Sequence, residues 1–163
     1  MNLIVVVDEK WGIGRKNGLL FRLKKDMAFF RKTTTGKVVV VGANTFASFP
    51  NGALPNRVNV VLDSSGAQHD GAITVATLNE LEAELSGYDT DDVYVSGGAS
   101  VYKLLLNKCR TAYVTKVQAD GQAQVFFPDL DELPNWELVK QSDEMDDEGY
   151  KITFCVYRNI NLA

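Results

Sequence analysis

The segment Lys37-Val-Val-Val-Val-Gly-Ala-Asn-Thr45 decides how this chain folds. Four consecutive valines without a polar residue are typical of a strand that is buried on both faces of a parallel sheet. The glycine ends this run, and a short helix is expected over Asn44–Ser48. The same design recurs at Asp92–Ser96, where a strand-like run meets Gly97-Gly98 and then a helix through Tyr102–Leu106. Parallel strands joined by helices are therefore the expected framework.

The remaining segments extend this pattern. Strands are predicted where short β-branched runs are bounded by turn residues, at Leu3–Asp8, Arg57–Leu62, Ala72–Ala76, Arg110–Gln118, Glu137–Gln141 and Tyr150–Arg158. Helices are predicted over Lys24–Thr34, which Gly36 stops, and from the capping box Thr77-Leu-Asn-Glu80 to Leu85. The turn Asp146–Gly149 predicts an antiparallel hairpin at the sheet edge. The sequence thus predicts a single α/β domain over residues 1–163, with a mostly parallel mixed sheet of about eight strands, helices on both faces and a C-terminal antiparallel hairpin.

Composition restricts the kind of function. The 163 residues carry 17 basic and 21 acidic side chains, a net charge of −4, which argues against a protein that tracks nucleic-acid phosphates. The longest apolar runs are far shorter than the ~20 residues of a membrane-spanning helix, and we expect no secretory leader. Neither nucleic acid nor a membrane is an expected partner. Two cysteines fit a reduced, cytoplasmic protein, and the single histidine, His69, argues against a histidine triad or multi-histidine metal site, so no metal is expected.

Asp26 is the most informative single residue. On a helical wheel of ~100° per residue it lies beside Phe30, at the edge of the apolar face that also contains Leu23 and Met27. Burial disfavours the ionised form of a carboxyl, so we expect the pKa of Asp26 to lie above its reference of about 3.9. Such a group can hold or relay a proton near neutral pH. The alternative is an acid that only favours the helix N-terminus or pairs with Lys25 on the surface.

Three glycine-containing turns are candidates for ligand binding. The glycine spacing in Gly12-Ile-Gly-Arg-Lys-Asn-Gly18 is one residue too long for the dinucleotide-binding fingerprint, and no acidic residue ends the second strand. A surface loop is therefore favoured over a Rossmann site, although a loop of this length can close over a ligand. Gly97-Gly-Ala-Ser100 and Gly42-Ala-Asn-Thr45 offer free backbone N–H groups at helix starts. Together these two turns fit a cleft that holds a diphosphate.

These residues resemble the dihydrofolate reductase family over nearly the whole chain. The resemblance rests on many short motifs in the family's order and spacing. They are Val7-Asp8, Gly12-Ile13-Gly14, Asn17-Gly18, Asp26 with Phe30 and Thr34, Gly42, Thr45-Phe46, Leu54-Pro55-Asn56-Arg57, Gly97-Gly98-Ala99, Val101-Tyr102, Thr115 and Phe127-Pro128-Asp129. The resemblance implies an oxidoreductase that reduces 7,8-dihydrofolate to 5,6,7,8-tetrahydrofolate by hydride transfer from NADPH, feeding one-carbon metabolism and thymidylate synthesis.

The resemblance also implies residue roles. Asp26 would bind the amino group and ring nitrogen of the pteridine and promote its protonation through water, and Thr115 would support the carboxylate by a hydrogen bond. The catalytic residues implied are Asp26, Phe21 and Thr115. The substrate would contact Ile4, Val5, Asp26, Met27, Phe30, Phe49, Arg57, Ser96 and Thr115. The NADPH cofactor would contact Val6, Ile13, Gly14, Asn17, Gly18, Leu19, Gly42, Ala43, Asn44, Thr45, Asp63, Ser64, Ser96, Gly97, Gly98, Ala99, Ser100, Val101 and Tyr102.

Two of these implied roles have a direct physical reason. The planar guanidinium of Arg57 suits bidentate contact, so it would pair with the carboxylate of the substrate's glutamate tail. The Gly12–Gly18 loop would close over the nicotinamide and exclude water. Ser96 stands where an aliphatic residue often borders the pteridine in the family.

The chain departs from the family pattern at several other positions. Leu20-Phe21 stands where many members have Pro-Trp, so a water-holding indole N–H is missing. Ala43, Ser100 and Ala76 replace frequent basic residues that read the 2′-phosphate of NADPH. Asp63 stands where the family often has Ser or Thr. We therefore expect NADPH to be preferred over NADH by a smaller margin than in relatives with these basic residues.

Two alternatives share parts of the pattern. A pyrimidine reductase of riboflavin synthesis has the same fold and nicotinamide cofactor, but it usually sits beside a deaminase domain. The acid on the first helix and the single-domain length favour the folate interpretation. A non-catalytic folate- or nucleotide-binding module is the second alternative. Under the leading interpretation the partners are dihydrofolate and antifolate inhibitors, and the protein acts as a monomer in the cytoplasm.

Overall fold

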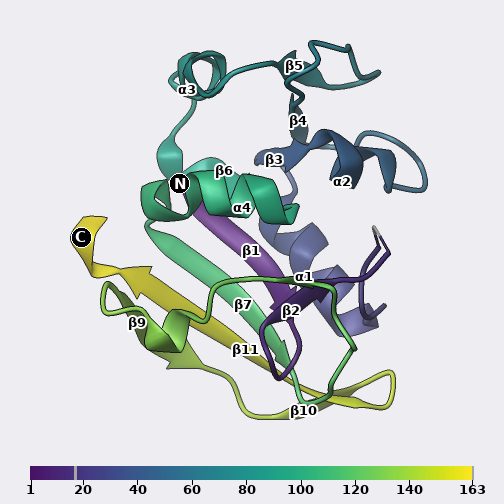
Figure 1. Ribbon diagram of the computed structural model, residues 1–163, viewed down its shortest axis with the longest axis vertical. Helices are drawn as coiled ribbons and strands as arrows, with labels where there is room; N and C mark the ends of the chain where they lie inside the picture. Colours follow the sequence, from purple (N-terminus) through teal and green to yellow (C-terminus); the bar gives the residue numbers. More distant parts are fainter. Residues whose placement is uncertain (17, 163) are drawn as a thin grey trace.

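A twisted β-sheet runs through the centre of the computed structural model, which describes residues 1–16 and 18–162 (Figure 1). Within these residues, nine strands form the main sheet in the order β10-β11-β7-β1-β6-β3-β4-β5, with β9 paired to β11. Their bounds are β1 Asn2–Val7, β3 Val38–Gly42, β4 Val58–Leu62, β5 Ile73–Val75, β6 Val93–Val95, β7 Thr111–Val117, β9 Trp136–Gln141, β10 Met145–Asp147 and β11 Tyr150–Asn159. Strands β7, β1, β6, β3, β4 and β5 pair in parallel, whereas β9, β10 and β7 pair antiparallel to β11.

Strands β9 and β10 share one edge of the sheet. β10 pairs with Tyr150–Ile152 of β11, and β9 pairs with Cys155–Asn159 of the same strand. The other edge of β11 pairs with β7 over Ile152–Arg158. The nine described strands therefore fill eight positions, which confirms the predicted mostly parallel sheet with an antiparallel C-terminal part.

Helices cover both faces of the sheet. They are α1 Lys24–Thr34, α2 Ala43–Ala47, α3 Leu78–Leu85 and α4 Ala99–Leu105, with 3-10 turns at η1 Thr90–Asp92, η2 Leu106–Lys108, η3 Leu130–Glu132 and η4 Ile160–Leu162. Val40 of β3 belongs to the same core cluster as Val101 of α4, whereas Val39 and Val41 cluster with Phe46 of α2. In Figure 1, α4 crosses the near face of the sheet and α1 lies behind it. Burial on both faces explains why the valine run contains no polar residue.

Helix α1 has the predicted bounds, but its apolar side chains are used differently. Leu23, just before the helix, is buried, whereas Met27 is 52% exposed. The helix is held instead by Phe29, whose ring lies 4.9 Å from that of Phe154 and 6.3 Å from that of Tyr113. The predicted apolar face is therefore only partly a core face. Its Met27 side remains open to a ligand.

The glycine-rich stretch is more ordered than the loop that the sequence predicts. It contains the short strand β2 Gly12–Gly14, which pairs with β8 Val125–Phe126. A Cβ on Gly12 would collide with the Cβ of Ala123, so this pairing requires glycine. The buried carboxylate of Asp8 accepts hydrogen bonds from the N–H groups of Gly12 and Gly121, at 2.7 and 3.0 Å. The base of the loop is therefore fixed to the segment that precedes β8.

The predicted C-terminal hairpin is present. Glu148 and Gly149 form the turn between β10 and β11, with φ values of 52° and 85°. Two positive φ values are characteristic of the type I′ turn of two-residue hairpins. Asp147 and Tyr150 pair across this turn. None of the helices in the described part of the chain is long and apolar enough to cross a membrane.

Candidate functional site

Asp26 lies in the first turn of α1, and its carboxylate contacts the central sheet through a hydrogen bond. The hydroxyl of Thr115 on β7 donates to Asp26 Oδ1 at 2.7 Å. Thr115 is 2% exposed and lies between Val6 of β1 and Phe154 of β11 in the sheet register. The sheet thus offers the carboxylate one polar contact in otherwise apolar surroundings.

These surroundings change the ionisation of Asp26. Burial raises the pKa of its carboxyl from 3.8 to about 6, the hydrogen bond from Thr115 opposes this rise, and the nearby charge of Asp147 adds to it. The direction and the main cause are those predicted from the helical wheel. A carboxyl with this pKa can hold or release a proton close to neutral pH.

The side chains predicted to line an apolar slot do not all point the same way. Ile4 of β1 lies on the face of the sheet that α1 and α2 cover, and Met27 and Phe30 lie on α1 itself. Phe49 follows α2 and packs with the helix through its cluster. Val5, by contrast, points to the opposite face and belongs to the core cluster under α4. Successive residues of a strand alternate between faces, so the side chain of Val5 cannot line the slot.

Arg57 is held beside the C-terminal half of α1. Its Nε donates a hydrogen bond to the carbonyl oxygen of Pro55 at 3.0 Å, and its Nη1 donates to the hydroxyl of Thr34 at 3.2 Å. The guanidinium carbon lies 5.9 Å from the centre of the Phe30 ring. Partial burial lowers its pKa, but a guanidinium remains cationic at physiological pH. A cation therefore lies beside the Phe30–Thr34 part of α1, one to two helical turns after Asp26 along the helix.

The two predicted strand–glycine–helix turns lie next to each other. Strands β3 and β6 are parallel neighbours, and the N–H of Gly42 donates a hydrogen bond to the carbonyl of Gly97 at 2.9 Å. A Cβ on Gly98 would lie 3.0 Å from Thr45 Oγ1, and a Cβ on Gly42 would lie 3.1 Å from Cγ2 of Val101. Both approaches favour residues without a side chain. The turns form one rim at the carboxyl ends of parallel strands, where open α/β sheets bind their ligands.

Two predicted cofactor residues have buried side chains that pack beneath the glycines of this rim. Val101 and Tyr102 are buried in the core, and the hydroxyl of Tyr102 donates to the carbonyl of Ile4 at 2.6 Å. Burial raises the pKa of Tyr102 above its ordinary value. The hydroxyl of Ser96 bonds weakly, at 3.3 Å, to the carbonyl of Tyr94. Val101 and Tyr102 can therefore contribute to a ligand site only through their backbone.

The loop residues predicted to contact the cofactor have different environments. Ile13 packs against the main core cluster, and Gly18 exchanges two backbone hydrogen bonds with Arg15, at 3.2 and 3.0 Å. Leu19 is 71% exposed. Asn17 lies outside the described residues. Closure of this loop over a ligand stays a prediction.

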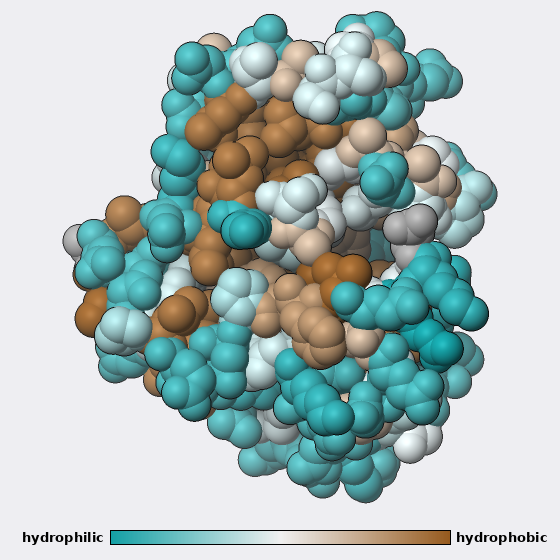
Figure 2. Space-filling model, in the orientation of Figure 1, coloured by the Kyte–Doolittle hydropathy of each residue, from teal (hydrophilic) through white to brown (hydrophobic). Residues whose placement is uncertain are grey.

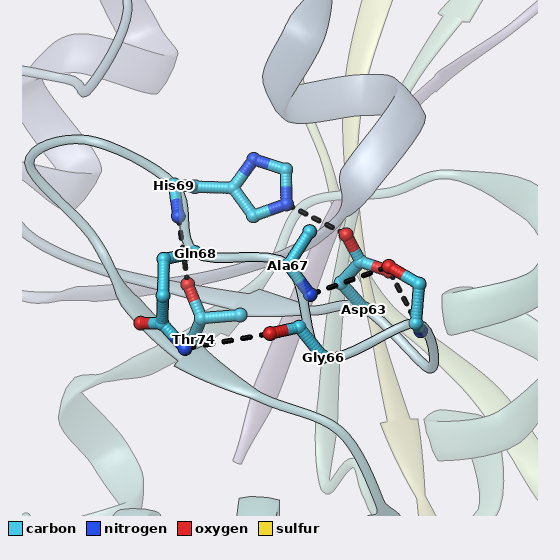
Figure 3. A network of polar contacts seen from close by, with 7 residues as sticks. Asp63, Gly66, Ala67, Gln68, His69 and Thr74 are labelled. Carbon is cyan, nitrogen blue, oxygen red and sulfur yellow. Dashed lines mark hydrogen bonds and ion pairs between the residues drawn. The ribbon is translucent and has the colours of Figure 1, made fainter.

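Asp63 follows β4, beside the Gly42 end of β3, and its carboxylate is already engaged (Figure 3). Its Oδ2 lies 2.7 Å from Nε2 of His69, and its Oδ1 accepts hydrogen bonds from the N–H and hydroxyl of Ser65 at 3.0 and 2.7 Å. These bonds, led by the one from His69, lower the pKa of Asp63 to about 2. The His69 ring packs edge-on against Phe46 of α2 at 5.6 Å. Asp63 is thus an ionised acid whose oxygens already accept hydrogen bonds from within the chain.

Sequence reasoning missed the acid that caps α1. Asp147 of β10 accepts hydrogen bonds from the N–H groups of Lys25 and Asp26, at 2.9 and 3.2 Å. One signal pointed to such a partner: Leu23 precedes the helix and has no side chain that can cap it, so the first N–H groups need an acceptor from elsewhere. His69, considered only as an argument against histidine sites, was also missed as the partner of an acid.

Comparisons with known proteins match this arrangement along the chain. A family model described as "Dihydrofolate reductase" matches residues 1–159. The dihydrofolate reductase of Bacillus subtilis (strain 168) is 32% identical over 166 aligned residues, covering 100% of this chain and 96% of the relative. That of Schistosoma mansoni is 30% identical and covers 96% of this chain and 95% of the relative. Among solved structures, dihydrofolate reductase from Enterococcus faecalis complexed with NADP(H) and RAB-propyl is similar with a TM-score of 0.86 and 29% identity, covering 96% of this chain and 94% of that one.

Proposed function

The chain belongs to the dihydrofolate reductase family, so its reaction is the NADP(H)-dependent reduction of dihydrofolate, and we propose that Asp26 is the centre of this reaction. The family match decides against the pyrimidine reductase of riboflavin synthesis and against a non-catalytic binding module. One observation carries the proposal for Asp26. Its carboxyl has a pKa of about 6, is held by Thr115 at 2.7 Å, and lies beside the exposed side chain of Met27.

Asp26 has two tasks in this proposal. Its carboxylate accepts hydrogen bonds from the amino group and a ring N–H of the pteridine, and such charge-assisted pairs fix the orientation of the ring. Each carboxylate oxygen has two acceptor sites, so the bond from Thr115 leaves room for the substrate. A negative charge beside the ring also favours protonation of the ring nitrogen, with water delivering the proton.

Apolar contacts and one cation complete the substrate site. Ile4, Met27, Phe30 and Phe49 present apolar surface to the pteridine and benzoyl rings from the face that α1 and α2 share. Arg57, which the hydroxyl of Thr34 and the Phe30 ring hold in place, pairs with the carboxylate of the glutamate tail. Inhibitors that carry the same amino groups and tail are expected to bind the same residues.

The rim formed by the glycine turns fits the nicotinamide cofactor. Side chains are absent at Gly42, Gly97 and Gly98, so a diphosphate can approach the N–H groups at the starts of α2 and α4 closely, and the hydroxyl of Thr45 lies next to the glycines. Figure 2 shows hydrophobic residues beside α4, between this helix and the segment that carries α3 and β5, which is apolar surface suited to the adenosine part. When bound, NADPH supplies the hydride. The chain's own groups bind the cofactor, orient it and exclude water.

The proposal is tested by following the absorbance of reduced nicotinamide with NADPH and dihydrofolate present. We expect Asp26→Asn to keep the fold and NADPH binding but to lose most of the activity near neutral pH. Activity should partly return at low pH, where solvent protonates the substrate. Parent-like turnover of Asp26→Asn at neutral pH would contradict the assignment of Asp26.

We also propose that the protein acts as a monomer in the cytoplasm. Its two cysteines, Cys109 and Cys155, are buried and unpaired, as expected in a reducing compartment. Burial raises the pKa of both thiols, which keeps them unreactive. Sedimentation at several protein concentrations tests the oligomeric state.

A further inference from the structure

The first turn of α1 depends on a carboxylate from another part of the chain. The N-cap residue, Leu23, makes no side-chain capping bond. Asp147 takes this role from β10: its Oδ2 accepts hydrogen bonds from the N–H groups of Lys25 at 2.9 Å and Asp26 at 3.2 Å. Asp147 is 4% exposed. One of its two partners is therefore the backbone of Asp26 itself.

Other contacts bring the same hairpin against the start of α1. The Lys25 Nζ donates to the carbonyl oxygen of Asp146 at 2.6 Å, and the Lys24 Nζ lies 3.6 Å from Glu148 Oε1. Ahead of the helix, Phe21 packs edge-on against Tyr150 with ring centres 4.9 Å apart. The type I′ turn of the hairpin thus places Asp147 next to Asp26 in a defined geometry.

The two carboxylates also interact through their charges. Burial is the main reason for the raised pKa of Asp26, and the like charge of Asp147 adds to it, against the opposing hydrogen bond from Thr115. Among the charged groups of the described residues, Asp147 is the one whose charge shifts the pKa of Asp26. Tyr102 of α4 is neutral because burial raises its pKa, the ammonium group of Lys25 is directed to the carbonyl oxygen of Asp146, and Arg57 lies beside the other end of α1.

We propose that Asp147 is a positioning residue for Asp26: it fixes the backbone of the catalytic turn, and its negative charge beside the Asp26 carboxyl favours the protonated form of that carboxyl. The role of Asp26 in dihydrofolate reduction rests on the function proposed above. A residue that served only as a helix cap would fix the turn without changing the ionisation of Asp26. The two roles can therefore be separated by a variant that keeps the acceptor oxygen and removes the charge.

Asp147→Asn is that variant, and Asp146→Asn is its matched control. The control removes the same charge from the adjacent residue, whose carboxylate is bonded to Lys151 at 2.6 Å and makes no bond to the N–H groups of α1. The titration of the Asp26 carboxyl carbon is followed by NMR in the parent chain and in both variants. We expect Asp147→Asn to lower the pKa of Asp26 by about half a pH unit, because a nearby like charge is gone. Asp146→Asn should not lower it.

Activity gives a second readout. In Asp147→Asn, the limb of the pH profile of kcat that reports the ionisation of Asp26 should move to lower pH by the same amount, whereas a purely structural defect would lower kcat without moving the limb. An unchanged Asp26 titration in Asp147→Asn, or an equal fall in both variants, would overturn the proposal. The NMR titration needs no substrate, so absence of dihydrofolate reduction in the parent would refute the proposed function without deciding this inference.

A measurement on the parent chain keeps the proposal testable if Asp147→Asn does not fold. Backbone N–H groups in the first turn of a helix usually lack intrahelical partners and exchange quickly with solvent. Because Asp147 accepts from them, the N–H groups of Lys25 and Asp26 should exchange as slowly as those in the middle of α1. Rapid exchange of both groups would show that the cap does not form, and the proposal would be wrong.

Discussion

Replacing Asp26 with asparagine should make the folded protein more stable at neutral and alkaline pH, while activity is lost. The partly buried carboxyl has a pKa of about 6, compared with an ordinary value of 3.8. At pH values well above 6, folding must therefore bring an already ionised carboxylate into surroundings that disfavour its charge. Asparagine removes that requirement and keeps an oxygen that can accept the hydrogen bond from Thr115.

The sign and size follow from proton linkage. A group whose pKa is raised on folding contributes stability that is fully present below its unfolded pKa and is lost as the pH rises through its folded pKa. The two values, about 6 and 3.8, differ by about 2.2, and one pKa unit corresponds to about 1.36 kcal/mol. The penalty in the parent chain thus grows between about pH 4 and pH 6 and reaches at most about 3 kcal/mol above that. This is a large share of the ~5–15 kcal/mol that stabilise a typical domain.

Urea unfolding of the parent and Asp26→Asn, at about pH 4 and about pH 8, measures this difference. We expect similar free energies of unfolding at the lower pH and a more stable Asp26→Asn at the higher pH. Asp146→Asn is a control of opposite sign, because Lys151 lowers the pKa of that exposed acid. A difference between parent and Asp26→Asn that does not change with pH would refute the reasoning, since packing alone would then explain it.

Three further substitutions test the remaining roles. Arg57→Leu should weaken dihydrofolate and antifolate binding by roughly 2–3 kcal/mol and leave NADPH binding unchanged, because only a charge-assisted pair to the substrate is lost. Equal weakening of substrate and NADPH binding in a titration would show that Arg57 only maintains the structure. Ala43→Arg should raise the ratio of kcat/KM for NADPH over NADH by roughly 10–100-fold, the effect of one charged hydrogen bond to the 2′-phosphate. An unchanged ratio would show that another group reads the phosphate. His69→Ala should raise the pKa of Asp63 from about 2 toward 3.8, measured by NMR, and an unaltered titration would contradict their pairing in solution.

Much of the fold could be predicted because short stretches of sequence determine the individual strands, helices and turns. The valine run of β3 and the bounds of α1 are visible in stretches of five to eleven residues, where strand and helix periods differ. The turn of Glu148 and Gly149 is likewise set by two neighbouring residues. The helical wheel placed the side chains of α1 correctly relative to one another, but it did not show which face of the helix meets the sheet. Phe29 took that role because Phe154 and Tyr113, far away in sequence, lie beneath it.

The site was predictable only where its chemistry lies within one element. The raised pKa of Asp26 follows from its own helix and the general effect of burial. Thr115 came from the family resemblance, because 89 residues separate it from Asp26 and no periodicity connects them. Asp147 lies 121 residues from Asp26, in a run of acidic residues that looks like a solvated turn in the sequence. Only the pairing of β10 with β11 shows that one acid of this run is buried.

Asp63 shows how tertiary pairing changes the meaning of a charge. In the sequence, Asp63 is a negative residue at a position where the 2′-phosphate of NADPH is expected to bind. Its charge would repel this phosphate and weaken the binding of NADPH. In the folded chain its oxygens already accept bonds from His69 and Ser65, so an added ribose hydroxyl would have to compete with partners at 2.7 to 3.0 Å. The His69 side chain also donates toward the acid and reduces its free acceptor capacity. We therefore expect the missing basic side chains at Ala43 and Ser100 to reduce the preference for NADPH, and the Ala43→Arg substitution tests this directly.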